Sequence, residues 1–136
     1  MTVFFVDSNV FLRFFARDDA KQADEAEKLF MRAKQGEIEL LCGPPVFFEV
    51  AGVLHSTFRL PYAAILDTLE SMLSIPNFTV LDADIITKAI TLARRKSIGF
   101  ADAYIAATAL EKGIGVATFN HQHFKKAGVQ IYQFTA

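Results

Sequence analysis

Three carboxylates in this sequence stand in apolar surroundings, where an unpaired charge is unfavourable. Asp7 lies in FFVDSNVF, Glu49 in VFFEVAG and Asp102 in GFADAYIAA. Burying an unpaired carboxylate costs several kcal/mol or more, so each of these acids needs a partner. The other acidic residues fall in loops, at helix caps or on exposed helix faces and need no such explanation.

Purely structural roles differ among the three acids. Asp7 and Asp102 stand where a side chain can cap the following helix. Glu49 shares a helix face with Val46 and Val53, at i−3 and i+4, which predicts that it points toward the core and has no capping role. A capping role for Asp7 and for Asp102 therefore stays open.

One divalent cation would offset all three charges together. Arg13 is the only positive charge in the apolar stretch 9–16, and it can pair with one acid but cannot neutralise three. Carboxylates are hard oxygen ligands, which suit Mg²⁺ or Mn²⁺. The sequence therefore predicts that Asp7, Glu49 and Asp102 share a metal ion.

Strands alternate with helices along the chain, and this order decides where the acids can meet. It predicts an α/β fold whose central, mostly parallel sheet has about five strands and helices on both faces. Ligand sites in such sheets lie beyond the carboxyl ends of the strands, at Asp7 and at 118–120 here. Ser8 is expected to be the N-cap of the first helix. We expect strands at 2–6, 37–42, 78–81, 114–119 and 129–134, and helices at 9–16, 20–35, 46–59, 62–75, 82–97, around Asp102 up to Gly113, and at 121–128.

Composition limits the class of protein. A chain of 136 residues fits one domain, residues 1–136, and the single Cys42 supports no disulfide framework. No signal peptide or membrane span is apparent, so we expect a cytoplasmic protein. A net charge of −1 argues against general nucleic-acid coating without excluding a nuclease. The 52% hydrophobic content favours an apolar face shared with a partner, and the fourteen Phe residues are interpreted as core and interface.

Four segments together resemble the motifs of the PIN-domain nuclease family, in order and in spacing. They are VDSNVFLRF, PPVFFEVAGVL, GFADAYIAATAL and GVATFNHQHF. The resemblance covers essentially the whole chain and is strongest to VapC-type toxins of toxin–antitoxin pairs. No single motif is specific, but the ordered set is.

The resemblance implies a three-layer α/β/α fold and a Mg²⁺- or Mn²⁺-dependent endoribonuclease. Asp7, Glu49 and Asp102 match the acidic metal ligands of the family, whose metal orients the scissile phosphate and activates a water. Other small polar positions of the family order the acids or their waters, although plain capping explains such residues equally well. These positions are matched by Ser8, Asn9 and Thr118.

The fourth motif departs from the pattern of the family. Many relatives carry an acid where Asn120 or His123 stands, so one negative charge is missing here. We expect weaker metal binding, a one-metal site or some preference for Mn²⁺, which tolerates an imidazole ligand. A surface histidine without a ligand role is the other interpretation of His123.

The expected partners are RNA, a cognate antitoxin that holds the ribonuclease inactive, and a second copy in a homodimer, with no role for a membrane. RNA contacts should come from basic side chains near the acids. A basic helix end also complements the helix dipole without any RNA, so that explanation stays open. The candidates are Arg13, Arg94, Arg95, Lys96, Lys125 and Lys126.

Two other functions compete with the ribonuclease. The missing fourth acid motivates a degenerate PIN domain that binds RNA or an antitoxin without turnover. A receiver-like or phosphatase-like domain with Asp7 as phosphoacceptor is the weaker alternative. It would need a paired acid or an Asp-x-Asp sequence, and DSN at 7–9 supplies neither.

Overall fold

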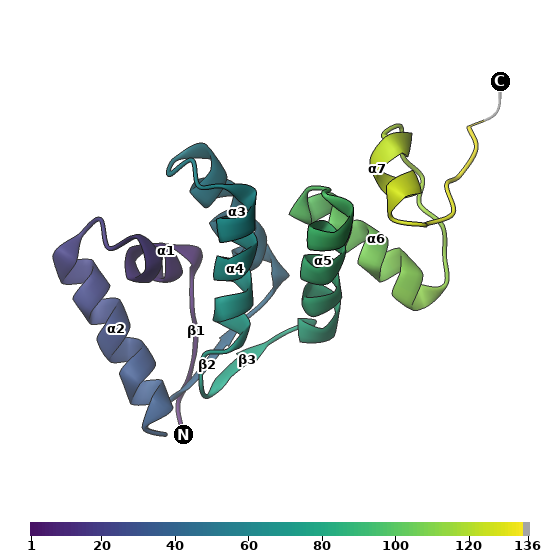
Figure 1. Ribbon diagram of the computed structural model, residues 1–136. Coiled ribbons are helices and arrows are strands. Elements are labelled where there is room, and N and C mark those ends of the chain that lie inside the picture. Colours follow the sequence, from purple (N-terminus) through teal and green to yellow (C-terminus); the bar gives the residue numbers. More distant parts are fainter. Residues whose placement is uncertain (135–136) are drawn as a thin grey trace. The chain divides into compact units, whose positions relative to one another are not determined.

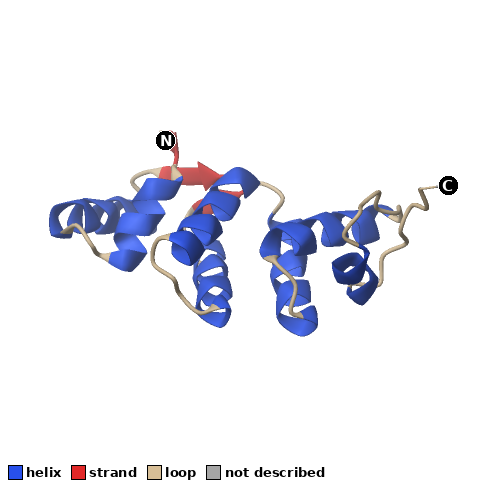
Figure 2. Cartoon of the chain, turned by 90° about the horizontal axis from the view of Figure 1, so that it is seen from above, coloured by secondary structure: helices blue, strands red, loops and turns tan. Residues whose placement is uncertain are grey.

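The chain folds into two compact units, the first over residues 1–83 and the second from residue 84 onward (Figure 1). The structure is a computed structural model and describes residues 1–134. Helices make up most of both units, and the regular strands are few and short (Figure 2). Each unit is described below by itself.

The first unit is built on a small parallel sheet with the order β1-β2-β3. The middle strand pairs with both neighbours, so that Leu41 is in register with Phe5 on one side and with Thr79 on the other. Parallel neighbours require crossover connections, and each crossover here contains two helices. The strands are β1 Val3–Phe5, β2 Glu39–Cys42 and β3 Phe78–Val80. The crossover helices are α1 Ser8–Ala16, α2 Ala20–Lys34, α3 Pro44–Ser56 and α4 Tyr62–Leu73.

Aromatic contacts join α1, α2 and the sheet in the core of the first unit. Phe11 is fully buried, and its ring centroid lies 5.5 Å from that of Phe30 and 5.5 Å from that of Phe78. Pairs at this spacing contribute beyond the area that they bury. This packing fixes α1, and with it the end of β1, against the rest of the unit.

The described part of the second unit, up to residue 134, consists of three helices and two extended segments. Helix α6 buries small side chains, among them Ala103, Ala106 and Ala107, and ends at Gly113 in the left-handed conformation that favours glycine. The helices are α5 Ala83–Lys96, α6 Phe100–Lys112 and α7 His121–Lys126.

The prediction of regular strands at 114–119 and 129–134 is wrong. Segments 114–119 and 129–134 form one isolated parallel bridge, Val116 with Ile131, supported by a 2.8 Å hydrogen bond from the Tyr132 amide to the Val116 carbonyl. Two segments paired without a third strand are marginal, which is the physical reason that the pairing stays short. The α/β class and the parallel sheet are confirmed, but the described residues form three strands rather than about five.

Cys42 ends β2 as a buried, free thiol. Burial raises the pKa of this thiol to about 12, so it stays protonated and unreactive near neutral pH. Among residues 1–134, no helix has both the length and the apolar character that crossing a membrane requires.

Close backbone approach at the Val116 bridge requires glycine at position 115. A Cβ atom added to Gly115 would lie 2.9 Å from the Gln130 carbonyl oxygen, whereas one added to Gly52, inside α3, would meet nothing within 4 Å. We expect Gly115→Ala to lower the free energy of unfolding by about 1–3 kcal/mol through this clash. The matched control Gly52→Ala should raise it by roughly 0.5–1 kcal/mol, because alanine is the better helix former. Urea unfolding of both variants checks this; equal stability of Gly115→Ala and wild type would contradict the account.

Candidate active site

Asp7 lies directly after β1, at the position that precedes α1. The N-cap is Asp7 and not Ser8 as predicted, because the helix already begins at Ser8. The Asp7 carboxylate makes no capping hydrogen bond, so the capping explanation of this acid is not supported. The side chain is exposed, and the positive end of α1 favours a negative charge there.

Glu49 projects from α3 to the surface rather than into the core, which corrects the prediction from helical spacing. The buried face of α3 runs through Val46, Phe47 and Val50, and Glu49 stands beside this face instead of within it. Its Oε2 atom accepts a hydrogen bond of 3.2 Å from the Ser8 hydroxyl. The charge therefore stays in contact with water while one oxygen is held in place.

Ser8 connects the first two acids. It is only 7% exposed, follows Asp7 in the chain, and holds Glu49 across 41 positions of sequence. The packing of α1 in the core thus sets where both carboxylates lie. This hydrogen bond fits the role predicted for Ser8, ordering an acid, which stays a prediction.

Asp102 lies in the first turn of α6 in the second unit. The N-cap of this helix is Gly99, so the capping explanation of Asp102 is wrong. Its carboxylate is bound by α7 and the residue before it. The Oδ2 atom lies 2.8 Å from Nδ1 of His123 and 3.5 Å from the Asn120 side-chain amide.

The residues of the fourth motif form a linked group around Asp102. The Asn120 side-chain nitrogen lies 3.1 Å from Nδ1 of His123, and the Asn120 backbone amide donates a 2.9 Å hydrogen bond to the Thr118 hydroxyl. The hydrogen-bond partners that this chain places against Asp102 are therefore neutral or protonatable side chains rather than acids. Four predicted residues, Thr118, Asn120, His123 and Asp102, are therefore brought together.

The donor set fits a hard divalent cation in its chemistry. Asp7 and Glu49 offer carboxylate oxygens in the first unit, and Asp102 does so in the second, with an imidazole and an amide beside it. Within residues 1–134, no three or more His, Cys, Asp or Glu side chains lie close enough together to hold a metal ion. A metal shared by the three acids therefore stays a prediction.

Arg13 is engaged away from the three acids. Its guanidinium donates a hydrogen bond of 2.8 Å to the Gln22 side chain and lies 3.3 Å from the Asp18 carboxylate. Both contacts are exposed. Asn9 and Arg13 line a pocket of about 510 Å³ on α1 and α2. No hydrogen bond or ion pair connects Asn9 to Asp7 or Glu49 in the part of the chain that the structure describes.

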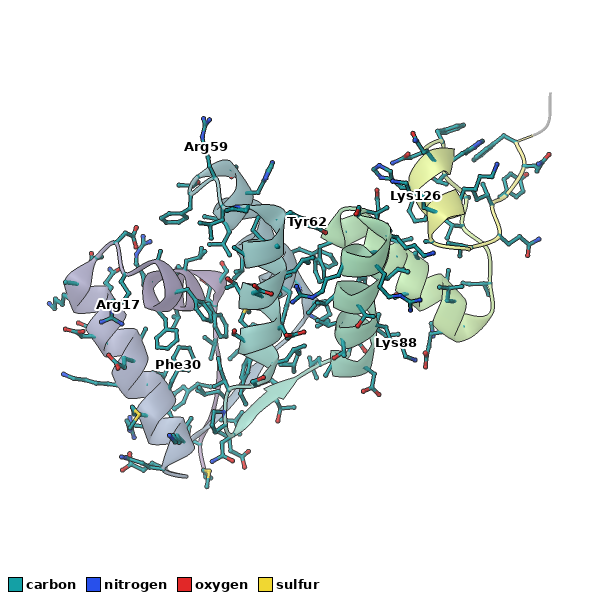
Figure 3. All side chains as sticks on the ribbon, viewed as in Figure 1. Arg17, Phe30, Arg59, Tyr62, Lys88 and Lys126 are labelled. Atoms are coloured by element: carbon teal, nitrogen blue, oxygen red, sulfur yellow. The ribbon has the colours of Figure 1, made fainter. Side chains whose placement is uncertain are left out.

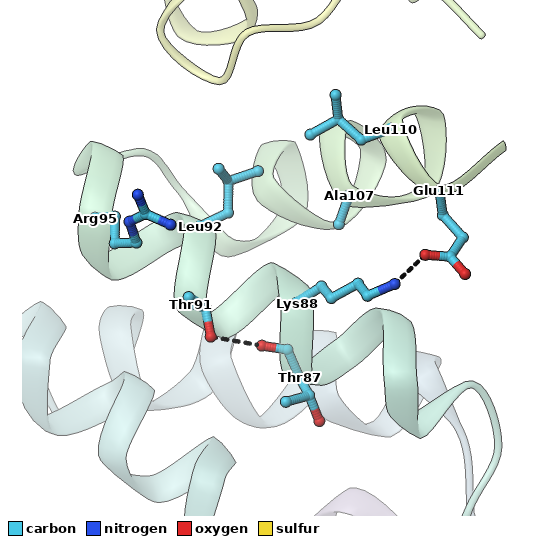
Figure 4. Close-up of a pocket in the computed structure, with 8 residues that line it drawn as sticks. All are labelled: Thr87, Lys88, Thr91, Leu92, Arg95, Ala107, Leu110 and Glu111. Carbon is cyan, nitrogen blue, oxygen red and sulfur yellow. Dashed lines mark hydrogen bonds and ion pairs between the residues drawn. The ribbon is translucent and has the colours of Figure 1, made fainter. Parts of the chain in front are cut away.

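Arg95 lines a pocket of about 410 Å³ between α5 and α6, with Leu92 and Leu110 on its walls and an ion pair between Lys88 and Glu111 (Figure 4). The other basic candidates, Arg94, Lys96, Lys125 and Lys126, are exposed. Lys126 projects from α7 in Figure 3. All five of these cations belong to the second unit, which also contains Asp102.

The sequence interpretation missed an aromatic surface in the second unit. Phe119 is 84% exposed, although the Phe residues were expected to serve the core and interfaces. The available signal was its position between Thr118 and Asn120, in a loop of polar side chains rather than in an apolar run.

The solved structures to which the chain is similar include several from toxin–antitoxin systems. The chain is similar to VapC20 of Mycobacterium tuberculosis, described as a toxin that cleaves the sarcin-ricin loop, at 20% identity and a TM-score of 0.43, covering 94% of this chain and 96% of that one. It is similar to VapBC2 of Rickettsia felis, solved with a DNA fragment of its promoter, at 18% identity and a TM-score of 0.40, covering 98% and 100%. For FitAcB of Neisseria gonorrhoeae the identity is 21% and the TM-score 0.37, covering 97% of each chain.

No curated protein matches the sequence. The PIN domain family, however, matches residues 4–129. This span runs through both units and contains Asp7, Glu49 and Asp102, so the resemblance inferred from the four segments is confirmed. The chain belongs to the PIN domain family.

Proposed function

We propose that this protein is a Mg²⁺- or Mn²⁺-dependent endoribonuclease, the toxin of a toxin–antitoxin pair. The observation that carries the proposal is the family match over residues 4–129. The acids Asp7, Glu49 and Asp102 lie inside this span, and by the resemblance of the four segments they are the proposed metal ligands. Each acid is exposed or half-buried, so each can reach a phosphate.

The way in which the acids are held supports a cation site over a structural role. Ser8 and Asn120, which hold Glu49 and Asp102, are neutral, and His123 is charged only when protonated. Within residues 1–134, neither Glu49 nor Asp102 forms an ion pair with a lysine or an arginine. The carboxylates of Glu49 and Asp102 are therefore positioned while their charge remains available for a cation.

A bound Mg²⁺ or Mn²⁺ would supply a Lewis acid for the scissile phosphate and a more acidic water. Asp7, Glu49 and Asp102 would hold the ion, and Ser8 would keep Glu49 from rotating away. His123 and Asn120 would fix the Asp102 carboxylate through its Oδ2 atom. Ordered ligands of this kind typically raise metal affinity, because less freedom is lost on binding.

RNA and protein partners follow from the same proposal. Phosphate contacts would come from the cations of the second unit, in particular Lys125 and Lys126, because α7 also supplies the Asp102 partner His123. Arg13 is a weaker candidate, since Asp18 and Gln22 already bind its guanidinium. A cognate antitoxin and a second copy of this chain are the proposed protein partners.

A binding module without turnover is the second candidate, and one observation favours it. His123 and Asn120 both contact the Oδ2 atom of Asp102, so they would compete with a cation for that oxygen. This version predicts RNA or antitoxin binding with no metal-dependent cleavage.

The acids are tested by cleavage of RNA with a titration of Mg²⁺ and Mn²⁺ and an EDTA control. We expect Asp7→Asn and Asp102→Asn each to lower the cleavage rate by more than roughly 100-fold. Replacing a residue that only supports a metal ligand typically lowers activity by about 10- to 100-fold, and loss of the ligand itself should cost more. Asp84→Asn, at an exposed acid in the first turn of α5, is the matched control and should cut at the wild-type rate. Both site variants should remain folded by circular dichroism.

Two outcomes would overturn parts of this assignment. Wild-type cleavage by Asp102→Asn would remove Asp102 from the machinery. If pure wild type binds RNA but does not cut with either metal, while Asn120→Asp or His123→Asp does cut, the binding module is the correct function.

The hydrogen bond between Ser8 and Glu49 is tested by a double-mutant cycle of Ser8→Ala and Glu49→Ala. We expect a coupling free energy of about 0.5–1.5 kcal/mol in urea unfolding, the range for a single net hydrogen bond. Glu39→Ala serves as the control partner, because Glu39 pairs with Val3 at the end of β1 that is farther from Ser8 in sequence. Zero coupling with Glu49, or equal coupling with Glu39, would show that Ser8 does not position this acid.

A further inference from the structure

Three aromatic side chains of the second unit form a surface cluster, which we call the aromatic cluster: Phe119, Tyr132 and Phe134. The rings of Phe119 and Phe134 are stacked, with centroids 4.4 Å apart and an interplanar angle of 20°. Tyr132 meets Phe134 edge-on at 4.9 Å and 82°. The cluster joins the loop before α7 to the segment after it.

The cluster is exposed to an unusual degree. Phe119 is 84% exposed, the highest value among the large apolar side chains of residues 1–134, and Tyr132 is 57% exposed. Scattered apolar residues on a surface are normal, but mutually packed aromatic rings with open faces indicate an interaction site. A partner with flat rings could stack on these faces and remove them from water.

The charge around the cluster favours a polyanion. His121 and Lys125 line a pocket of about 460 Å³ together with Tyr132 and Phe134, and among residues 1–134 no carboxylate lines it. Helix α7, of sequence HQHFKK, contains no acid either. Aromatic faces beside cations are how proteins bind single-stranded nucleic acid, since the bases stack while the phosphates meet the positive charge.

The cluster is continuous with the group around Asp102. Phe119 immediately precedes Asn120, whose backbone amide is bound by Thr118 and whose side-chain amide lies 3.5 Å from the Asp102 carboxylate. The backbone that presents the Phe119 ring is therefore fixed by the same contacts that hold the acid.

We propose that the aromatic cluster is a stacking platform for an unpaired base of an RNA strand, with His121 and Lys125 on the adjoining phosphates. This inference rests on the proposed ribonuclease function, because it gives the base a place next to Asp102. It makes Phe119 a residue that selects single-stranded over double-stranded RNA, since a base inside a duplex cannot offer its face to the ring. A protein segment or a second copy of this chain is the competing occupant.

The sharpest test uses the absence of tryptophan from the sequence. In Phe119→Trp the indole is the only one in the protein, and its emission reports directly on stacking. We expect oligouridine of about 12 nucleotides to quench it in EDTA, where no metal-dependent cleavage occurs. Met31→Trp, at an exposed position of α2, is the matched control and should not be quenched.

Affinity measurements in the same buffer complete the test. Phe119→Leu and Phe134→Leu keep apolar bulk but lose the ring face, and should weaken oligouridine binding roughly tenfold, whereas Phe119→Tyr should bind like wild type. Lys125→Ala should reduce the salt dependence of binding, which the leucine variants should leave unchanged. Binding of a blunt RNA duplex should not respond to Phe119→Leu.

Each alternative outcome decides the matter. Unchanged affinity of Phe119→Leu with an unquenched Phe119→Trp overturns the platform, and if the leucine variant does not fold, the tryptophan variant decides alone. A shift from dimer to monomer in sedimentation, with unchanged RNA affinity, assigns the cluster to a second copy and overturns the proposal. Binding is measured without turnover, so the two proposals can fail separately. Absence of cleavage would refute the nuclease function and leave the stacking platform intact. Unchanged binding by Phe119→Leu would refute the platform and leave the nuclease function intact.

Discussion

The structure depends on hydrogen bonds that orient the carboxylates of Glu49 and Asp102 without neutralising their negative charge. Ser8 donates to Glu49, while Asn120 and His123 contact Asp102. Replacing these partners with lysine or arginine would neutralise the acids permanently and remove the reason for a cation to bind. Hydrogen bonds to neutral donors orient a carboxylate at modest cost, and the remaining negative charge is what a metal ion recognises.

The fold supplies rigid supports for this arrangement. In the first unit, the buried Phe11 fixes α1 against α2 and β3, so that Asp7 at the end of β1 and Ser8 at the start of α1 have defined positions. In the second unit, Asp102 stands on α6, whereas its partners come from the loop and first turn of α7. The exposed aromatic cluster uses that loop again, so a single short segment orders an acid and presents Phe119.

Helical periodicity and capping residues allowed most of the fold to be predicted from the sequence. The helix that ends at Gly113 and the strand at 78–81 were located closely, because glycine and β-branched residues mark such boundaries. Two features could not be predicted. A strand needs neighbours that sequence does not reveal, so 114–119 remained a single bridge. Burial of Glu49 was inferred from spacing alone, but the buried face of α3 is centred on Val50 and Phe47 and leaves Glu49 outside it.

The central proposal, that Asp7, Glu49 and Asp102 would hold one cation, is tested most directly by paramagnetic broadening of assigned amide signals during a Mn²⁺ titration. The account predicts that signals from all three positions broaden together, at the same low Mn²⁺ concentration, and return on addition of EDTA. Broadening at Asp102 alone, or at Asp7 and Glu49 without Asp102, would contradict a shared ion and with it the proposed nuclease site.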